Sequence, residues 1–561
     1  MKINSIIWPY GRTFALILVT SYLFMESMHS ISQDIPAQGM YFSKKKYISH
    51  HLPGYIETKN LLPQPIYDEN TQWIEMYWKA WEMAFNNFHE PAAGSGYVSQ
   101  FLDCAFNANI FLWDMSFQTM FLNTAHQLVP GISSLDNFYA KQHETGEICR
   151  EINRTTGIDF EFWQNAENLP LFSRWGFDEY FNQYKADVVY IGRDTPYPNP
   201  KLTLDALNHP ILAWAELESY KWTGDKTRLE TVRLPLVKYY EALQKYIRQG
   251  NGLYITDWAS MDNSPRNICL ASGGTGVDIS SEMVLFARNL SELSEILGYK
   301  EDAKHFDTEA NTLAAIINAK MWDDEKGFYF DLTLDEKFCG IKTIAAFWTL
   351  LSKTATPERA ELLAGHLTNP KTFYRKHPVP TLAADEKEYF PQGGYWSGAV
   401  WVMTNTMVIK GLEEYHYDEL AREIALKHLD AVSRVYAQTG TFWENYAADT
   451  IKEGVNTNGA AVVKDIVGWG ALAPVLYLIE YGIGLKPDAP DNELTWEIFS
   501  DKRSGCEKFR FNGHQVDLLA NPSGKELVVL VRSDGEFLLK IIRKGVEKNY
   551  HIVRGENRFI F

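Results

Sequence analysis

Cysteine, positive charge and long apolar runs are all scarce in this sequence. Its 561 residues include five cysteines, odd in number and without CxxC spacing, so we expect free buried thiols and neither a zinc site nor a disulfide framework. The 54 Lys plus Arg are outnumbered by 71 Asp plus Glu, a net charge of −17, which argues against nucleic acid as a partner. Hydrophobic residues at 45% and charged residues at 22% exclude a largely disordered chain.

The one conspicuous apolar run lies near the start of the chain, from Thr13 to Met25. It follows two basic residues and is too short to cross a bilayer comfortably, but it has the length of a signal-peptide core. Ser30 and Ser32 then stand two apart, the spacing of a signal peptidase site. We therefore expect residues 1–32 to be a signal peptide and the mature protein to be periplasmic or secreted, without a membrane span. An uncleaved anchor is the alternative.

Helical periodicity dominates residues 71–486, after a turn-rich leading segment at 33–70. In Ser280–Gly298, apolar residues recur at three- and four-residue spacing along one face, and the glycine ends the helix. Similar stripes recur in His209–Gly224, Thr227–Gly250, Glu358–His366, Tyr417–Gly440 and Gly468–Gly482. Such evenly spread helices, each burying one stripe, predict a layered helical body.

The pattern changes to β from about residue 487. Leu527–Val531 and Phe537–Ile542 are strand-like and flank Ser533-Asp534-Gly535, which predicts a hairpin around a tight turn. The tail Tyr550–Phe561 could add another strand. We expect residues 487–561 to form a small C-terminal β domain without catalytic residues.

The common catalytic and metal-binding motifs are missing. There is no HExxH, GxxxxGK[ST] or GxSxG. The pairs His143-Glu144 and His89-Glu90 lack a second His at the helical interval, and Asp323-Asp324-Glu325 lacks the rest of a calcium loop. No metal and no cofactor are therefore expected. Aromatic residues reach 14%, with 17 Trp, and such rings are a surface on which sugars stack.

Three acidic residues stand beside aromatic rings in loops: Asp262 after Trp258, Glu444 between rings, and Asp114 beside Trp113. Two carboxylates facing each other across an aromatic pocket supply the proton donor and the base or nucleophile that glycosidic bond cleavage needs. Burial against an indole raises the pKa of a carboxyl group and keeps a donor protonated. Taken alone, an acid beside aromatic rings is more often a helix cap or a satisfied hydrogen-bond acceptor than a catalytic group.

Four motifs between residues 262 and 470 carry a family resemblance, and their order and spacing match that family along roughly Trp113–Leu485. They are Asp-Asn-Ser-Pro-Arg at 262–266, Gly-Gly-Tyr-Trp-Ser-Gly-Ala-Val-Trp at 393–401, Trp-Glu-Asn-Tyr at 443–446 and Val-Gly-Trp-Gly at 467–470. Together they resemble glycoside hydrolase family 63 and the mannosylglycerate hydrolase-like group, six-hairpin glycosidases related to the trehalases. The resemblance implies an (α/α)6 toroid, here with the small C-terminal β domain.

The resemblance also implies roles for individual residues. Asp262 matches the general acid and Glu444 the general base of an inverting mechanism, so we expect their carboxyl groups to lie roughly 6.5 to 9.5 Å apart. Asp114 and Asp465 are the reserves if either is misplaced. The expected substrate-binding residues are Trp113, Asp114, Trp258, Tyr395, Trp396, Trp401 and Trp469, with Arg266 and Asn445 as candidates to orient the acids.

Two departures from the family pattern fall near the expected pocket. Ser397 stands where relatives often have Arg, and Asn208-His209-Pro210 stands where they often have Gln-Pro-Pro. Serine cannot replace the fork of donors that a guanidinium presents. The substrate therefore need not be the commonest one of the family.

The leading functional prediction is an exo-acting α-glucosidase for short oligosaccharides or glycosides. An α-mannosidase and a glucosylglycerate- or mannosylglycerate-type hydrolase are alternatives within the same chemistry. A polysaccharide lyase of the α/α-toroid type would need a Tyr, His or Lys base and usually a cationic groove, which a charge of −17 disfavours. A non-catalytic carbohydrate-binding protein would keep the tryptophans but could lose one of the two acids.

Overall fold

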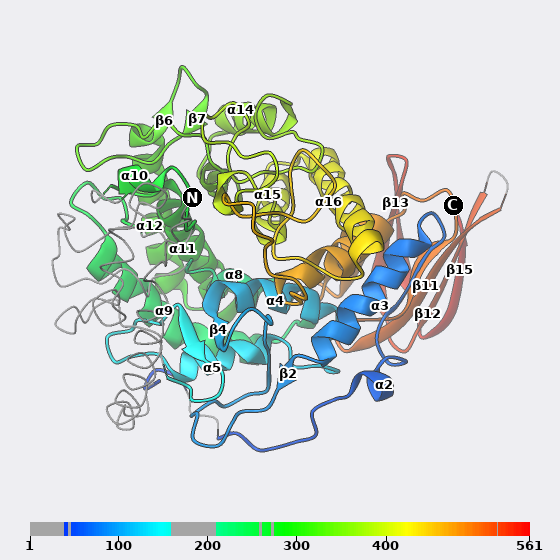
Figure 1. Cartoon of the computed structure of the whole chain (residues 1–561). Coiled ribbons are helices and arrows are strands. Elements are labelled where there is room, and N and C mark those ends of the chain that lie inside the picture. Colours follow the sequence, from blue (N-terminus) through cyan, green and yellow to red (C-terminus); the bar gives the residue numbers. More distant parts are fainter. Residues whose placement is uncertain (1–38, 43–45, 159–208, 257–260, 271–273, 524–525) are drawn as a thin grey trace, which may run out of the picture. The chain divides into compact units, whose positions relative to one another are not determined.

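A computed structural model describes residues 39–42, 46–158, 209–256, 261–270, 274–523 and 526–561 (Figure 1). The expected signal peptide lies outside these residues. Within them, no helix combines the length and the apolar character that a membrane crossing needs. Six helical segments are buried on most sides: α4 (Leu112–Leu122), α8 (Leu212–Thr223), α11 (Val277–Leu297), α13 (Trp348–Leu351), α15 (Val402–Glu413) and the π-helical η10 (Leu472–Ile483).

These six segments form the inner ring of the fold. Each contacts the next in the order α4, α8, α11, α13, α15 and η10, and η10 returns to contact α4. For η10 the reason is its composition, because a helix that is apolar on almost every side has to be covered on every side. All twelve residues of η10, for example, are buried. The closed ring confirms the (α/α)6 expectation.

Helices with one solvent-facing side pack outside the ring. They are α3 (Thr71–Phe85), α9 (Lys226–Ile247), α12 (Lys300–Lys320), α14 (Pro357–Thr368) and α16 (Asp418–Thr439). Helix α11 begins three residues before the predicted start and ends, as predicted, at Gly298, which adopts φ +85°. Shorter turns fill the loops: α2 (Tyr55–Thr58), α5 (Asp136–Ala140), α10 (Asn267–Leu270), η3 (Asn123–Ala125), η4 (Ile132–Leu135), η7 (Ile344–Phe347), η8 (Tyr395–Ser397) and η9 (Trp469–Ala471).

Two sheets make up the C-terminal region, which Figure 1 shows beside α3 and α16. The five-stranded sheet has the order β1 (Gln64–Tyr67), β10 (Ser504–Phe511), β11 (His514–Ser523), β12 (Glu526–Ser533) and β15 (Gly555–Ile560). The four-stranded sheet has the order β14 (Val546–Ile552), β13 (Phe537–Arg543), β9 (Glu493–Glu497) and β8 (Leu485–Asp488). Strand β1 thus comes from the leading segment of the chain. Three short pairs lie elsewhere: β2 (Phe88–His89) with β3 (Phe101–Leu102), β4 (Asn109–Phe111) with β5 (Glu151–Asn153), and β6 (Trp322–Asp323) with β7 (Phe328–Tyr329).

The predicted hairpin is wrong in its pairing, although both of its strands exist. Strand β12 pairs with β11 and β15, whereas β13 pairs with β14 and, in parallel, with β9. The turn after Ser533 therefore carries the chain from one sheet to the other. Both strands have a buried alternating face, and such a face is covered by an opposing sheet. The rings of Phe511 and Phe537, one from each sheet, meet with centroids 5.1 Å apart.

The expectation of free thiols is also wrong for two cysteines. Cys269 and Cys339 form a disulfide with their Cα atoms 5.9 Å apart, whereas Cys104, Cys149 and Cys506 are buried thiols outside any disulfide. The bonded pair lies 70 positions apart in the chain, so no local spacing pattern announces it. Because Cys269 lies in α10, directly after the loop of Asp262, the disulfide ties that loop to the segment after β7.

Removing this disulfide is expected to destabilise the fold. A cross-link closing a loop of this length removes unfolded-chain entropy worth about 4 kcal/mol. We expect the double variant Cys269→Ser/Cys339→Ser to lose stability on that scale in urea unfolding. Cys506→Ser, which alters a buried thiol outside the disulfide, is the matched control. An unchanged unfolding midpoint in the double variant would contradict the assignment.

Candidate active site

A cavity of about 200 Å³ lies at the amino-terminal ends of inner segments α4, α15 and η10. Its lining includes eight residues singled out in the sequence: Trp113, Asp114, Asp262, Tyr395, Trp396, Trp401, Glu444 and Trp469. These residues come from five separate stretches of chain. A larger hollow of about 490 Å³ beside α16 is lined mostly by charged side chains and holds none of them.

Not every expected residue reaches the cavity. Arg266 and Asn445 are buried outside its lining, and Trp258 and Asn208 lie outside the described residues. The remaining lining residues were not anticipated: Phe106, Asn107, Phe111, Arg150, Glu151 and Met403. Arg150 and Glu151 stand at the start of β5, in no motif that the sequence displays. They form an ion pair, with 2.9 Å between Nη2 of Arg150 and Oε1 of Glu151. Their place in the cavity could not be predicted from a motif.

Asp262 lies in the turn before α10. The side-chain amide of Asn267 donates to the carbonyl oxygens of Met261 at 2.9 Å and of Asp262 at 3.0 Å, which fixes this turn. Burial raises the pKa of Asp262 to about 7, against the lowering effect of Arg150 and with a further rise from the charge of Glu444. Near neutral pH this carboxyl group therefore holds a proton for much of the time, as a proton donor requires.

Asn263, which sequence reasoning passed over, joins the acid loop to the aromatic loop. Its side-chain amide donates to the carbonyl oxygen of Gly394 at 3.0 Å and accepts from the backbone N–H of Trp396 at 2.9 Å. The Ser397 hydroxyl donates to the main-chain oxygen of Asn263 at 3.3 Å. Serine at this departure from the family pattern thus braces the acid loop and does not line the cavity.

Glu444 is held from three sides. Its carboxylate accepts the Tyr395 hydroxyl at 2.8 Å on Oε1 and the backbone N–H of Val463 at 3.1 Å on Oε2. The indole of Trp469 donates to the Glu444 main-chain oxygen at 2.8 Å. Burial raises the pKa of Glu444, and both hydrogen bonds to the carboxylate act in the opposite direction. These bonds favour the ionised form, which is the one a general base needs.

Arg266 is buried outside the cavity lining. Its guanidinium is 1% exposed and forms ion pairs with Asp278 at the start of α11 and with Asp331 at 2.5 Å. The cation and both partners are buried, so each offsets the cost of burying the others. Because Arg266 follows Asp262 by four residues, this triad anchors the acid loop on the ring.

Aromatic rings form a continuous wall of the cavity. Trp396 and Trp401 stack with centroids 4.4 Å apart and planes 10° apart. Trp113 lies 6.3 Å from Trp396, and Trp469 lies 6.1 Å from Trp401. Beside this wall, Asp114 has one buried carboxylate oxygen without a partner among the described residues, and burial raises its pKa to about 7. Asp114 is thus a lining residue of the cavity whose carboxyl group is largely buried.

Comparison with known proteins agrees with this geometry. Residues 198–453 match the sequence profile described as "Mannosylglycerate hydrolase MGH1-like glycoside hydrolase domain". Together with the cavity geometry, this match identifies the chain as a glycoside hydrolase. The glycoside hydrolase is 28% identical over 436 residues to an uncharacterized protein of Borreliella burgdorferi, covering 75% of this chain and 82% of that protein.

Two relatives with named activities match shorter stretches of the glycoside hydrolase. A mannosylglycerate hydrolase of Rubrobacter radiotolerans is 30% identical over 190 residues, covering 33% of this chain and 39% of that enzyme. A periplasmic trehalase of Escherichia coli is 27% identical over 212 residues, covering 37% of this chain and 36% of that enzyme. The match thus spans less than two-fifths of the length of either enzyme.

Among solved structures, the mannosylglycerate hydrolase of Thermus thermophilus in complex with glucose has the same fold. It aligns with a TM-score of 0.52 at 20% identity, covering 71% of this chain and 98% of that chain. A sialidase structure aligns with a TM-score of 0.56 at 12% identity, covering 97% of this chain and 43% of that chain. At these identities the alignments establish the fold alone.

Tyr395→Phe is expected to shift the pH dependence of the glycoside hydrolase. The substitution removes a hydrogen bond that lowers the pKa of Glu444. Without this bond the pKa of Glu444 rises. As the pH falls, Glu444 is therefore protonated earlier and activity is lost at a higher pH than in wild type. A bond to a charged group corresponds to about one pH unit, which a profile of kcat/KM against pH would measure. Tyr389→Phe, which removes a hydroxyl bonded to Asp449 outside the cavity, is the control; an unmoved acidic limb in Tyr395→Phe would contradict the assignment.

Proposed function

We propose that this glycoside hydrolase is an exported, exo-acting α-glycosidase of the α-glucosidase type, which cleaves short oligosaccharides or glycosides with inversion. The observation that carries the proposal is the pair Asp262 and Glu444 on one small aromatic-walled cavity. At about 200 Å³, this cavity is smaller than the roughly 300 to 1,000 Å³ of pockets that take drug-sized ligands. Such a size favours a single terminal sugar unit.

In the proposed mechanism the two acids divide the proton transfers. Protonated Asp262 donates to the leaving oxygen while the glycosidic bond breaks. Ionised Glu444 takes a proton from a water molecule that attacks the opposite face of the sugar ring. We expect the carboxyl groups to stand roughly 6.5 to 9.5 Å apart, which leaves room for that water. No cofactor takes part in these steps.

Arg150 supports a second candidate, a glucosylglycerate- or mannosylglycerate-type hydrolase. Arg150 lines the same cavity as the two acids, and guanidinium groups suit carboxylates such as that of glycerate. We expect Arg150→Met to raise the KM of a glycosylglycerate much more than that of a neutral glycoside if this candidate is correct.

Export of the enzyme is supported by two features. The Cys269–Cys339 disulfide is of a kind that persists in oxidising compartments and is rare in the cytosol. The apolar run Thr13–Met25 with its serine-rich cleavage pattern fits a signal peptide. We therefore propose a periplasmic or secreted location.

The test is a substrate panel assayed with wild type and Glu444→Gln. The panel contains α-glucosides, α-mannosides, trehalose, glucosylglycerate and mannosylglycerate. Release of glucose by wild type and not by the variant supports the leading proposal, and preference for a glycosylglycerate selects the second candidate. An unsaturated, ultraviolet-absorbing product from a uronate polymer would indicate a lyase. Binding of sugars without turnover of any of them would indicate a binding protein.

A further inference from the structure

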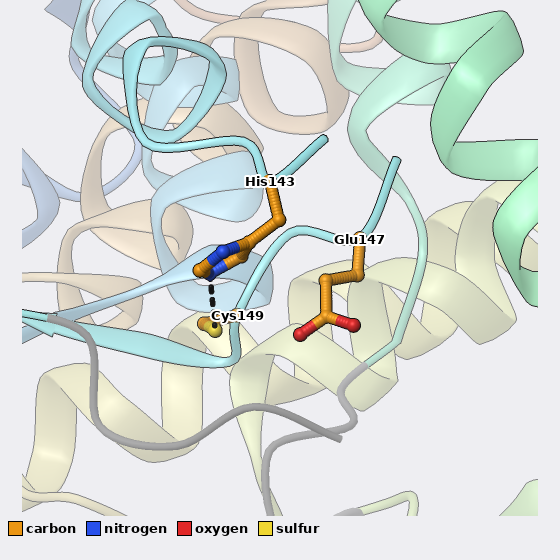
Figure 2. A group of neighbouring side chains, drawn as sticks. All are labelled: His143, Glu147 and Cys149. Carbon is orange, nitrogen blue, oxygen red and sulfur yellow. Dashed lines mark hydrogen bonds between the residues drawn. The ribbon is translucent and has the colours of Figure 1, made fainter. Parts of the chain in front are cut away.

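Three side chains of metal-binding types converge outside the cavity lining: His143, Glu147 and Cys149 (Figure 2). Their candidate ligand atoms all lie within 4.8 Å of one another. The Sγ atom of Cys149 and the Nε2 atom of His143 are 3.6 Å apart. A sulfur at about 2.3 Å and a nitrogen at about 2.0 to 2.1 Å from one tetrahedral zinc ion stand about 3.6 Å from each other. The pair therefore already has the spacing of two zinc ligands.

The loop that carries these residues is fixed by its own hydrogen bonds. The backbone N–H of His143 donates to the Glu147 carbonyl at 3.0 Å, and that of Gly146 donates to the His143 carbonyl at 2.9 Å. The amide of Gln142 donates to the Gly146 carbonyl at 2.8 Å and to the Pro235 carbonyl of α9 at 2.9 Å. The turn is thus held against α9, with its side chains in place before any ion arrives.

A buried hydroxyl beside the cluster is a second, independent observation. Tyr239 on α9 is fully buried, and its hydroxyl has no hydrogen-bond partner among the described residues. The loop packs on the same stretch of α9, since a Cβ atom placed on Gly146 would lie 2.3 Å from the Lys238 carbonyl oxygen and 3.2 Å from the Ala242 Cβ atom. A lone buried hydroxyl is costly unless something bonds it. A metal-bound water would do so.

We propose that His143, Glu147 and Cys149 form a binding site for a zinc-like divalent metal ion, with a water molecule at the fourth position. A thiolate, an imidazole and one carboxylate favour zinc over calcium or magnesium, which prefer all-oxygen ligands. The sequence reading set His143 aside because no second His follows at a helical interval. The fold supplies Cys149 instead, through a turn and not a helix.

The site has a clear structural consequence. Arg150 and Glu151 follow Cys149 directly in the chain and line the active-site cavity. An ion on Cys149 would therefore fix the start of β5 and, with it, the only guanidinium of the described cavity lining. The proposed role is positional, and the site does not depend on the proposed substrate.

The experiment uses the purified full-length protein, with ZnCl₂ and CoCl₂ as probes. We expect one tightly held ion per chain by metal analysis after dialysis. Bound Co²⁺ is expected to show thiolate-to-metal charge-transfer absorption with the d–d bands of tetrahedral coordination. In Cys149→Ser the charge-transfer band should vanish, and in both Cys149→Ser and His143→Gln zinc affinity should fall by at least about 100-fold. Cys506→Ser, at another buried thiol, should bind as wild type does.

Two results would overturn the proposal. One is wild-type protein that retains no stoichiometric zinc and shows no charge-transfer band with Co²⁺. The other is zinc binding that survives in both Cys149→Ser and His143→Gln. If Cys149→Ser fails to fold, His143→Gln decides the matter by itself, because His143 is partly exposed and its replacement leaves the buried residues in place. Zinc should also raise the thermal midpoint of wild type and Cys506→Ser but not of the ligand variants.

Discussion

Asp262→Asn is expected to lower kcat about 10³-fold on a glycoside whose leaving group is an alcohol or a second sugar. Such a leaving oxygen needs a proton as the bond breaks, and the amide cannot supply one. The basic limb of the pH profile should disappear as well. In wild type, activity is expected to fall above about pH 7, because the pKa of Asp262 lies at about 7 and only the protonated form donates.

The choice of leaving group provides the control for this variant. A dinitrophenyl glycoside leaves without a proton, so Asp262→Asn should cleave it within about tenfold of wild type. Asp465→Asn is the matched substitution elsewhere, since Asp465 lies outside the cavity lining and bonds Thr441. Equal losses on both kinds of substrate would show that Asp262 is not the acid.

Glu444→Gln is expected to abolish turnover of every substrate, with kcat lowered by about 10³- to 10⁴-fold. Water must lose a proton whatever the leaving group is, so an activated glycoside should not rescue this variant. Gln keeps the shape of Glu, although its single amide oxygen can accept only one of the two bonds from Tyr395 and Val463; we expect the loss to fall mainly on kcat and less on KM. Steady-state kinetics on both classes of glycoside, with the thermal midpoint as a folding control, provide the measurement.

Azide offers a positive test of the same role. A small anionic nucleophile needs no base, so it should restore product formation in Glu444→Gln as a glycosyl azide. The same anion should not restore Asp262→Asn on a glycoside with a poor leaving group. Residual activity of Glu444→Gln within about tenfold of wild type would contradict the assignment of the base.

Local patterns were enough to predict the helical fold. The stripe in Ser280–Gly298 does form a helix, because a helix that buries one face needs apolar residues at three- and four-residue spacing. Which strands pair is a non-local matter, and here the prediction failed. The turn after Ser533 has the composition of a hairpin turn, yet β12 and β13 lie in different sheets. In this arrangement each strand has its buried face covered by the opposite sheet.

The site was predictable to the extent that its residues belong to motifs. Asp262, Glu444 and the tryptophans stand in such motifs and do line one cavity. Arg150 could not be predicted in this way, because it belongs to no motif and only the folded ring places it beside the other lining residues. Arg266 shows the opposite case, because it belongs to a motif but does not line the cavity. Its ion pairs with Asp278 and Asp331 could not be predicted from the motif.

The stereochemistry of the first product tests the central claim most directly. An NMR time course on an α-glucoside or an α-mannoside, read before mutarotation, reports which anomer of the sugar the wild-type enzyme releases. We predict that the wild-type enzyme releases the β anomer and that Glu444→Gln releases no sugar. Release of the α anomer would mean retention, and would contradict the roles assigned to Asp262 and Glu444.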